Sequence, residues 1–206
     1  MKNKVLLGFF ISLINGFSCS SFSVFDVNKN DENELSQICA LFEDTKNSRE
    51  SFTDPEDISK MIHGDTYKTV VCKTNTVPPV VVGVLSYVYR HKGMVEHGKN
   101  IAWKTLGSGY VKMNSDAICY SIIAVHPEYR RQGVATELMQ HTDKSCIALG
   151  MKNIILWVYK DNKRAIECYE KEGFSILEEG SLTKKMHKSL DYVDSPLYFL
   201  NKIKKA

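Results

Sequence analysis

Two apolar segments on either side of a helical pattern constrain the fold of this chain more than any other feature. Residues 117–125, AICYSIIAV, and residues 153–159, NIILWVY, are almost continuously apolar, which is typical of strands buried on both faces of a sheet. Between them, residues 133–150 carry apolar side chains at helical spacing: Leu138, Met139, Cys146 and Ile147. A strand, a helix and a strand in succession predict two parallel strands joined by a right-handed crossover.

Shorter patterns along the rest of the chain predict one α/β domain around this unit. Alternating or apolar runs predict further strands at residues 22–27, 67–74, 80–91, 174–179 and 197–203. Apolar side chains at helical spacing predict helices at residues 31–45, 53–64 and 164–172, and Gly173 ends the last of these. Pro78-Pro79 marks a short turn between two of the strands, so that pair should be antiparallel.

The turn that joins strand 117–125 to the following helix has an unusual composition, Arg130-Arg131-Gln132-Gly133-Val134-Ala135. The first backbone N–H groups of a helix have no partner within the helix and carry a partial positive charge, so they attract anions. The small glycine and alanine let a phosphate approach these groups closely, and the arginines add charge. The turn therefore predicts a pyrophosphate-binding loop. A charged surface turn ahead of a helix is the alternative.

Composition and charge argue against several other classes of protein. The net charge is +3 and no basic stripe interleaves with aromatic side chains, so nucleic-acid binding is not favoured. A phosphate loop of the form Gly-x-x-x-x-Gly-Lys-Ser/Thr is absent. No His or Cys pair has the spacing of a zinc site, so we expect no metal. Five cysteines lie within apolar patterns and are interpreted as buried free thiols, which suit a reducing compartment: Cys39, Cys72, Cys119, Cys146 and Cys168.

Residues 1–21 differ from the rest of the chain. Two lysines precede the apolar run VLLGFFISLI, and small residues follow it, which is the layout of a secretory signal peptide. We expect this segment to export or anchor the protein, with residues 5–17 at the membrane and residues 22–206 as the domain. The run is shorter than the roughly 20 residues of a spanning helix. The alternative is an N-terminal element packed on a cytoplasmic domain, which the free thiols favour.

The turn and the segment after it also resemble a known family. Arg130-x-x-Gly133-x-Ala135, which follows an apolar strand, resembles the acetyl-CoA motif of the GNAT superfamily of N-acetyltransferases. Residues 153–174, NIILWVYKDNKRAIECYEKEGF, resemble its next block: a strand, an asparagine, a helix with alanine and tyrosine, and then Gly-Phe. The resemblance implies an α/β (α+β) fold of GNAT type. Such a fold has a mixed, mostly antiparallel sheet of six to seven strands, helices on both faces, and a parallel pair that splays at the cofactor site.

The resemblance further implies acetyl-CoA as cosubstrate and assigns residues to it. The end of strand 117–125 would pair with the pantetheine chain, and the turn would hold the pyrophosphate. The implied cofactor-binding residues are Ile123, Val125, Arg130, Arg131, Gln132, Gly133, Val134, Ala135, Asn162 and Ala165. Tyr169 matches the general acid, because a phenol can protonate the thiolate that leaves a thioester. A core tyrosine is the alternative, since Tyr169 shares a helical stripe with Ile166.

The base and the acceptor of such a reaction are less defined by the sequence. Many family members place a glutamate on the strand that matches residues 117–125, but here the strong polar side chains are Tyr120 and Ser121. We expect water, or no dedicated base, to take the proton, and we interpret His126 as structural. The resemblance implies a primary amine as acceptor, on a small molecule, a peptide or a protein, with residues 91–116 as one wall of its site. A CoA-binding module without catalysis is the alternative.

Overall fold

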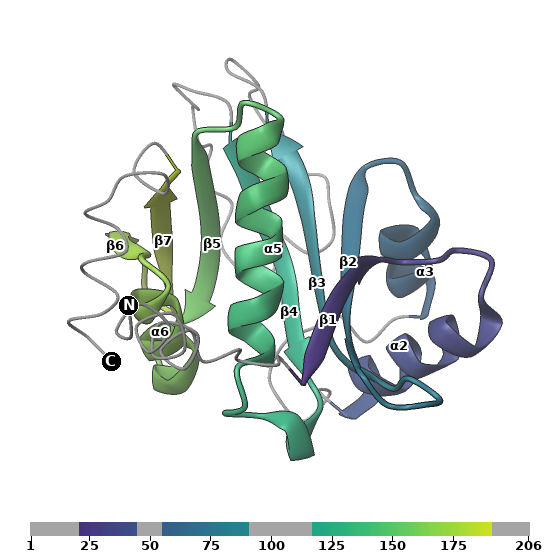
Figure 1. The fold of residues 1–206 in the computed structure, drawn as a ribbon. Helices are drawn as coiled ribbons and strands as arrows, with labels where there is room; N and C mark the ends of the chain where they lie inside the picture. The colour runs from purple at the N-terminus through teal and green to yellow at the C-terminus, as the bar shows by residue number, and fades with distance from the viewer. Residues whose placement is uncertain (1–20, 45–54, 91–116, 191–206) are drawn as a thin grey trace, which may run out of the picture.

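A seven-stranded sheet organises the part of the chain that the computed structural model describes, which is residues 21–44, 55–90 and 117–190 (Figure 1). Its strand order is β1-β2-β3-β4-β5-β7-β6. The strands are β1 (Phe22–Asp26), β2 (Tyr67–Thr74), β3 (Val81–Arg90), β4 (Ala117–Val125), β5 (Asn153–Tyr159), β6 (Ser175–Glu179) and β7 (Thr183–Ser189). The helices are α2 (Glu32–Asp44), α3 (Pro55–His63), the 3-10 helix η1 (Pro127–Tyr129), α5 (Val134–Ala148) and α6 (Lys163–Lys171).

One pair of neighbouring strands, β4 and β5, is parallel, and the other pairs are antiparallel. Helix α5 joins β4 to β5, as the succession of apolar, helical and apolar segments predicts. The β2–β3 pair on either side of Pro78-Pro79 is antiparallel, also as predicted. The expected fold class, a mixed sheet with one parallel pair and helices on both faces, is therefore confirmed.

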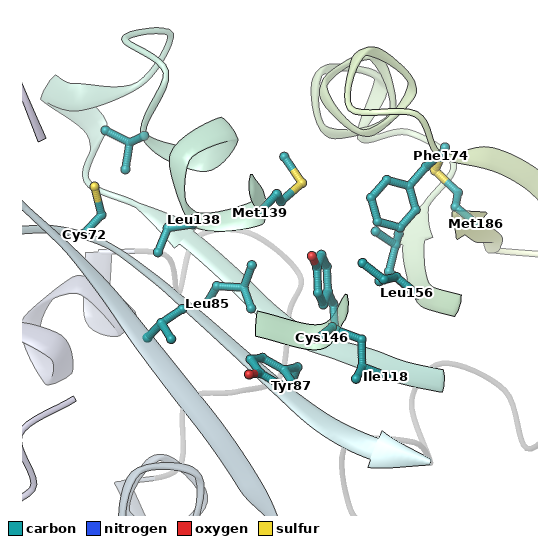
Figure 2. Packing of buried hydrophobic residues seen from close by; sticks show 14 of the residues in the cluster. Cys72, Leu85, Tyr87, Ile118, Leu138, Met139, Cys146, Leu156, Phe174 and Met186 are labelled. Carbon is teal, nitrogen blue, oxygen red and sulfur yellow. The ribbon is translucent and has the colours of Figure 1, made fainter. Parts of the chain in front are cut away.

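Each face of the sheet carries its own apolar cluster. On one face α5 packs against the strands through Leu138 and Met139, and Phe174, just after α6, lies beside Met186 of β7 (Figure 2). Figure 1 shows α5 crossing this face of the sheet. On the other face α2 and α3 cover β2, β3 and β4. The two faces of the sheet at β5 and β7 therefore have different neighbours.

One of the seven strands was not predicted from the sequence patterns. The structure places β7 at Thr183–Ser189, TKKMHKS, between β5 and β6, whereas the strand predicted at residues 197–203 lies outside the described residues. Strand β7 contains three lysines, so its sequence lacks the apolar pattern that indicates a strand. One of them, Lys188, is buried and forms an ion pair with the buried Asp143 of α5. Its partner is distant in sequence, so no local pattern reveals that this lysine belongs inside.

Helix α6 ends at a glycine, as predicted. Gly173 has a positive φ of 94°, its N–H donates to Glu170 O at 3.1 Å, and the Phe174 N–H donates to Tyr169 O at 3.0 Å. This is the Schellman arrangement, and Gly150, with a φ of 73°, ends α5 in the same way. The arrangement turns the chain back so that Phe174 lies close to Tyr169.

The cysteines of the described chain are free thiols. Cys72, Cys119 and Cys146 are buried, and Cys168 is half-buried. Cys39 is exposed, so its interpretation as a buried thiol was wrong, because α2 covers the sheet with only one of its faces. Burial raises the pKa of both Cys72 and Cys146 to about 12, so these two thiols remain protonated.

Several predictions concern residues outside the described part of the chain. These are the signal or anchor segment, residues 1–21, of which only the last residue is described, and the proposed acceptor wall, residues 91–116. Among the described ranges, no helix has the length and apolar character that crossing a bilayer requires. The N-terminal and acceptor-side assignments stay predictions.

Candidate active site

The parallel strands β4 and β5 pair over only part of their length. Their last register pair is Cys119 with Ile155, although β4 continues to Val125 and β5 to Tyr159. Beyond that pair the two facing backbone edges are not bonded to each other, and the strands diverge (Figure 1). We call the residues of both strands beyond the last pair the β4–β5 divergence. It confirms the expected splayed pair.

A β-bulge lies at the start of the divergence. Ser86 of β3 pairs with Ile122 and Tyr87 pairs with Tyr120, so Ser121 is an extra residue in β4. The bulge shifts the alternation of side chains: Tyr120 belongs to the cluster under α5 and α6, and Ile122 belongs to the cluster under α2 and α3. Because a bulge bends and twists its strand, it gives β4 a physical reason to leave β5 here.

The open edge of β4 presents backbone groups in the divergence. The His126 N–H donates to Val82 O on β3. Because peptide groups alternate between the two edges of a strand, those of Val125 and Ile123 face away from β3. The Val125 carbonyl accepts a hydrogen bond of 3.1 Å from Arg130 Nε, so Arg130 closes the end of this edge. The peptide groups of both residues predicted to pair with pantetheine therefore lie on an edge of β4 at which the described residues place no strand.

The turn after β4 leaves the first N–H groups of α5 without a side-chain partner. Arg131 and Gly133 have positive φ values of 64° and 89°, and α5 begins at Val134 with no side-chain cap. The first helical bond runs from the Glu137 N–H to Gly133 O at 2.9 Å, so the N–H groups before it have no acceptor in the helix. A Cβ on Gly133 would meet nothing within 4 Å. The turn is thus an open concavity of N–H donors, which suits an anion.

Close packing on β3 fixes the position of this turn. A Cβ on Gly83 would lie 2.5 Å from Val134 Cγ1 and 3.1 Å from Leu138 Cδ1, so the absent side chain lets the first turn of α5 approach the sheet. The Val134 side chain is buried in this contact, and only its backbone can serve a ligand. Arg131 and Gln132 are exposed, and the Gln132 amide donates to η1.

Three predicted site residues lie on α6 or at its start: Asn162, Ala165 and Tyr169. Asn162 Oδ1 accepts a hydrogen bond of 3.2 Å from the Ala165 N–H, so it caps the start of α6. Tyr169 is half-buried, and its ring centroid lies 5.8 Å from that of Phe174. Phe174 in turn lies 5.9 Å from Tyr120. One phenylalanine therefore connects Tyr169 to the first residue of the divergence.

The polar side chains at the start of the divergence are poor proton acceptors. The Tyr120 hydroxyl and Ser121 Oγ are buried and have no hydrogen-bond partner among the described residues. Burial raises the pKa of Tyr120 well above its ordinary value, so the phenol stays protonated. His126 packs edge-on against Tyr129, in keeping with its structural interpretation.

A buried carboxylate that the sequence patterns did not indicate joins α5 to α6. Glu172 is 5% exposed, and it accepts hydrogen bonds from Thr136 Oγ1 at 3.0 Å and from Gln140 Nε2 at 3.4 Å. It directly follows the helix that carries Tyr169. No local signal separates Glu172 from the exposed Glu170; only the packing of two helices does. In the described ranges, no group of three His, Cys, Asp or Glu side chains is placed to hold a metal ion.

Both the sequence and the fold of this chain match known proteins. The model of the acetyltransferase (GNAT) family matches residues 35–174. An acetyltransferase of the GNAT family from Staphylococcus aureus superposes with a TM-score of 0.58 and 12% identity, covering 82% of this chain and 99% of that chain. A mutant spermidine N-acetyltransferase from Vibrio cholerae gives a TM-score of 0.56 and 17% identity over 84% and 96% of the two chains.

A third solved structure shows the same likeness. It is the ribosomal-protein-S18-alanine N-acetyltransferase from Escherichia coli, with a TM-score of 0.55 and 16% identity over 86% of this chain and 99% of that chain. At these identities the solved structures show a shared fold. The family match covers most of the described residues, including the turn, the divergence and α6. The chain therefore belongs to the GNAT family of acetyltransferases.

Proposed function

We propose that this protein is an N-acetyltransferase, which moves an acetyl group from acetyl-CoA directly to a primary amine. The observation that carries the proposal is the meeting of two sets of unpaired backbone groups. The open edge of β4 ends at Val125, and the uncapped start of α5 follows at Val134. Membership of the family implies CoA binding, and these groups lie where the family motif falls in the sequence.

The unpaired groups suit the separate parts of acetyl-CoA. The N–H groups around Gly133 to Ala135 would hold the pyrophosphate, with the exposed Arg131 adding positive charge. The backbone of Ile123 and Val125 would pair with the amides of pantetheine. Because the Val125 carbonyl already accepts a bond from Arg130, we expect its N–H to be the group that serves the ligand.

Tyr169 is proposed as the general acid. When the amine attacks the thioester, the carbon–sulfur bond breaks and the thiolate leaves with the electron pair. A proton from the phenol of Tyr169 would then neutralise the sulfur. The ring contact with Phe174, which itself contacts Tyr120 at the start of the divergence, supports this role by placing Tyr169 near that point.

Water is proposed to take the proton of the amine. Strand β4 carries no Asp or Glu, and the Tyr120 phenol stays protonated because its pKa is raised. The lack of a carboxylate on β4 also favours a second candidate function, a CoA-binding module without catalysis. The two functions share the cofactor and differ in turnover.

Release of free thiol from acetyl-CoA, measured against a panel of primary amines, tests the proposal. We expect release that depends on the amine, together with the acetylated amine as a product in mass spectrometry. A rise in melting temperature with acetyl-CoA, but no amine-dependent release, would support the non-catalytic module instead. If acetyl-CoA changes neither quantity, the cofactor assignment is wrong.

We also propose that residues 1–21 direct the chain to a membrane, with the domain beginning at Phe22. The basic start and the apolar run support this assignment. The buried thiols of Cys72 and Cys146 and the need for acetyl-CoA, which is made inside cells, favour a reducing environment for the domain. An anchored protein whose domain faces the cytoplasm meets both conditions, and so does delivery from a bacterium into a host cell.

A further inference from the structure

The side chains of β5 and β7 alternate between the two faces of the sheet. Leu156 of β5 and Met186 of β7 belong to the cluster under α5 and α6. Trp157, Lys185 and His187 therefore lie on the opposite face, which we call the outer face. Among the described helices, α2 and α3 pack on that side of the sheet over β2, β3 and β4.

Lys185 is a nearly buried lysine that has no counter-ion among the described residues. The residue is 8% exposed, and its Nζ lies 5.7 Å from the centre of the Trp157 ring. Within the described chain it forms no ion pair, not even with Glu178, its register partner on β6. Its aliphatic part is therefore buried, and the neighbour of its amino group that the structure describes is the aromatic ring.

The other two lysines of the same strand are paired. Lys184 bonds to Glu179 at 3.1 Å, and Lys188 bonds to Asp143. The lysines of β7 that share a face with α5 and α6 are thus paired, whereas the lysine of the outer face has no carboxylate partner in the part of the chain that the structure describes. Because an ammonium group that has no carboxylate partner can pair with an external anion, the arrangement suits a place where an anion binds.

His187 shares the outer face and adds no charge there. Its Nε2 lies 2.7 Å from Asn153 Oδ1. Burial lowers the pKa of His187, and the charge of Lys185 lowers it further, so the imidazole is neutral at neutral pH. We call Trp157, Lys185 and His187 the outer-face patch. Its positive charge comes from Lys185, which lies beside an aromatic ring and a neutral imidazole.

This patch extends from the divergence. Trp157 stands two residues beyond Ile155, the last residue of β5 that pairs with β4, so Trp157 itself belongs to the divergence. Lys185 is the register partner of Trp157 on the next strand, and neighbouring strands are about 4.8 Å apart. A small molecule with one end at the divergence can therefore reach Lys185 across the Trp157 ring.

From this placement, and resting on the proposed function, we propose that the acceptor is an amine that also carries a carboxylate. The carboxylate pairs with Lys185, the apolar body lies on Trp157, and the amine points to the divergence. A polyamine of the same length would bring a second ammonium against Lys185 and is a poor acceptor.

Three amines that share a benzylamine core and differ in the para substituent test the charge preference: 4-(aminomethyl)benzoate carries an anion there, benzylamine a hydrogen atom and 1,4-bis(aminomethyl)benzene a cation. We expect the full-length protein to acetylate the benzoate with a kcat/KM at least about tenfold above that of the diamine. Lys185→Met removes this preference, whereas Lys185→Arg keeps it. Lys184→Met is the matched control: it removes a lysine from the same strand but from the other face, and it leaves the preference intact.

A binding measurement separates the carboxylate site from the chemistry. The chain has two tryptophans, Trp103 and Trp157, so the measurement uses a Trp103→Phe background. We expect 4-methylbenzoate to quench the fluorescence of Trp157 without any acetyl-CoA, and Lys185→Met to abolish the quenching. If Lys185→Met does not fold, Lys185→Gln replaces it in both assays. Folding of each variant is checked by its melting temperature.

The outcomes distinguish the two proposals. Quenching that depends on Lys185, with no transfer to any amine, supports the carboxylate site and overturns the proposed enzyme activity. Transfer to all three amines at equal rates, with Lys185→Met without effect, overturns the carboxylate site and leaves the activity standing. Absence of both quenching and transfer overturns both.

Discussion

Glu172 accepts a hydrogen bond of 3.0 Å from Thr136 and so ties the end of α6 to the first turn of α5. Thr136 follows the N–H groups that we propose for the pyrophosphate, and Glu172 comes one helical turn after Tyr169. A single contact therefore joins the proposed cofactor end of the site to the proposed acid. Both partners are largely withdrawn from water. We therefore expect loss of the Thr136 hydroxyl to disturb both the proposed cofactor end and the position of the proposed acid.

Thr136→Val keeps the shape of the side chain and removes its hydroxyl. We expect the free energy of unfolding to fall by about 1–3 kcal/mol, since the buried carboxylate loses a partner, and the KM for acetyl-CoA to rise. Urea denaturation and steady-state kinetics measure the two effects. Thr142→Val is the control: it removes a buried hydroxyl that bonds within α5 to Leu138 O, and it should leave KM unchanged. An equal KM change in both variants would contradict the link to the cofactor.

Gly133→Val should abolish the rise in melting temperature that acetyl-CoA gives the parent protein. A β-branched residue at a φ of 89° costs about 1–3 kcal/mol of backbone strain, so the turn relaxes away from its concave form. Gly150→Val is the matched control, because Gly150 also has a positive φ and open space around it, at the other end of α5. It should lower stability by a similar amount and keep the shift. Loss of the shift in both variants would argue against a cofactor site at the turn.

Tyr169→Phe should lower kcat by about a hundredfold or more, within the range for loss of a general acid, with little change in the Kd for acetyl-CoA. The phenylalanine keeps the ring contact with Phe174, so stability should hold. Tyr129→Phe is the control, since the Tyr129 ring packs on Phe22 and His126, away from α6. Stopped-flow binding and turnover measurements separate the effects. An unchanged kcat in Tyr169→Phe would make it a core tyrosine.

Thiol labelling of the native protein at pH 8 should modify Cys39 rapidly and leave the buried cysteines of the described chain unmodified. Cys39 is exposed, whereas Cys72 and Cys146 have a pKa of about 12 and hold almost no thiolate at that pH. Mass mapping of the labelled peptides measures this, with the urea-unfolded protein as the reference. Rapid labelling of Cys72 in the native state would show that the α5 face opens readily. Cys39→Ser also lowers the background of thiol-release assays.

N-terminal sequencing of the protein from its native cell checks the targeting proposal. We expect either a chain that begins near Phe22 or an intact chain in the membrane fraction, because residues 1–21 have the layout of a signal or anchor. Deleting residues 1–21 should release the domain into the soluble fraction with its melting temperature unchanged. An intact Met1 in a soluble cytosolic fraction would contradict the proposal.

The parts of the fold that depend on local patterns could be predicted from the sequence. The expected bounds of 67–74, 117–125 and 153–159 are those of β2, β4 and β5, because long apolar and β-branched runs leave little choice of structure. The end of α6 was predicted as well, because Gly173 supplies a positive φ that other residues avoid. The motif in the turn gave the start of α5 to within a residue.

The parts that depend on distant partners could not be predicted. Strand β7 was missed because the Lys188 charge is neutralised by Asp143, which lies on a different element. The buried Glu172 is defined by two donors on α5. Lys185 gains its significance only from the register that places it beside Trp157. Charge patterns alone describe all of these side chains as solvent-facing.

The brevity of the β4–β5 ladder has a mechanical consequence. Three register pairs join β1–β4 to β5–β7–β6 at one end, so backbone bonds connect the two parts of the sheet over a short stretch only. A ligand that lies between the two parts of the sheet and whose amides bond to the edge of β4 would strengthen the connection between them. Its binding would add cross-strand bonds that the polypeptide itself lacks, and the resistance of the sheet to unfolding would become in part a property of the ligand.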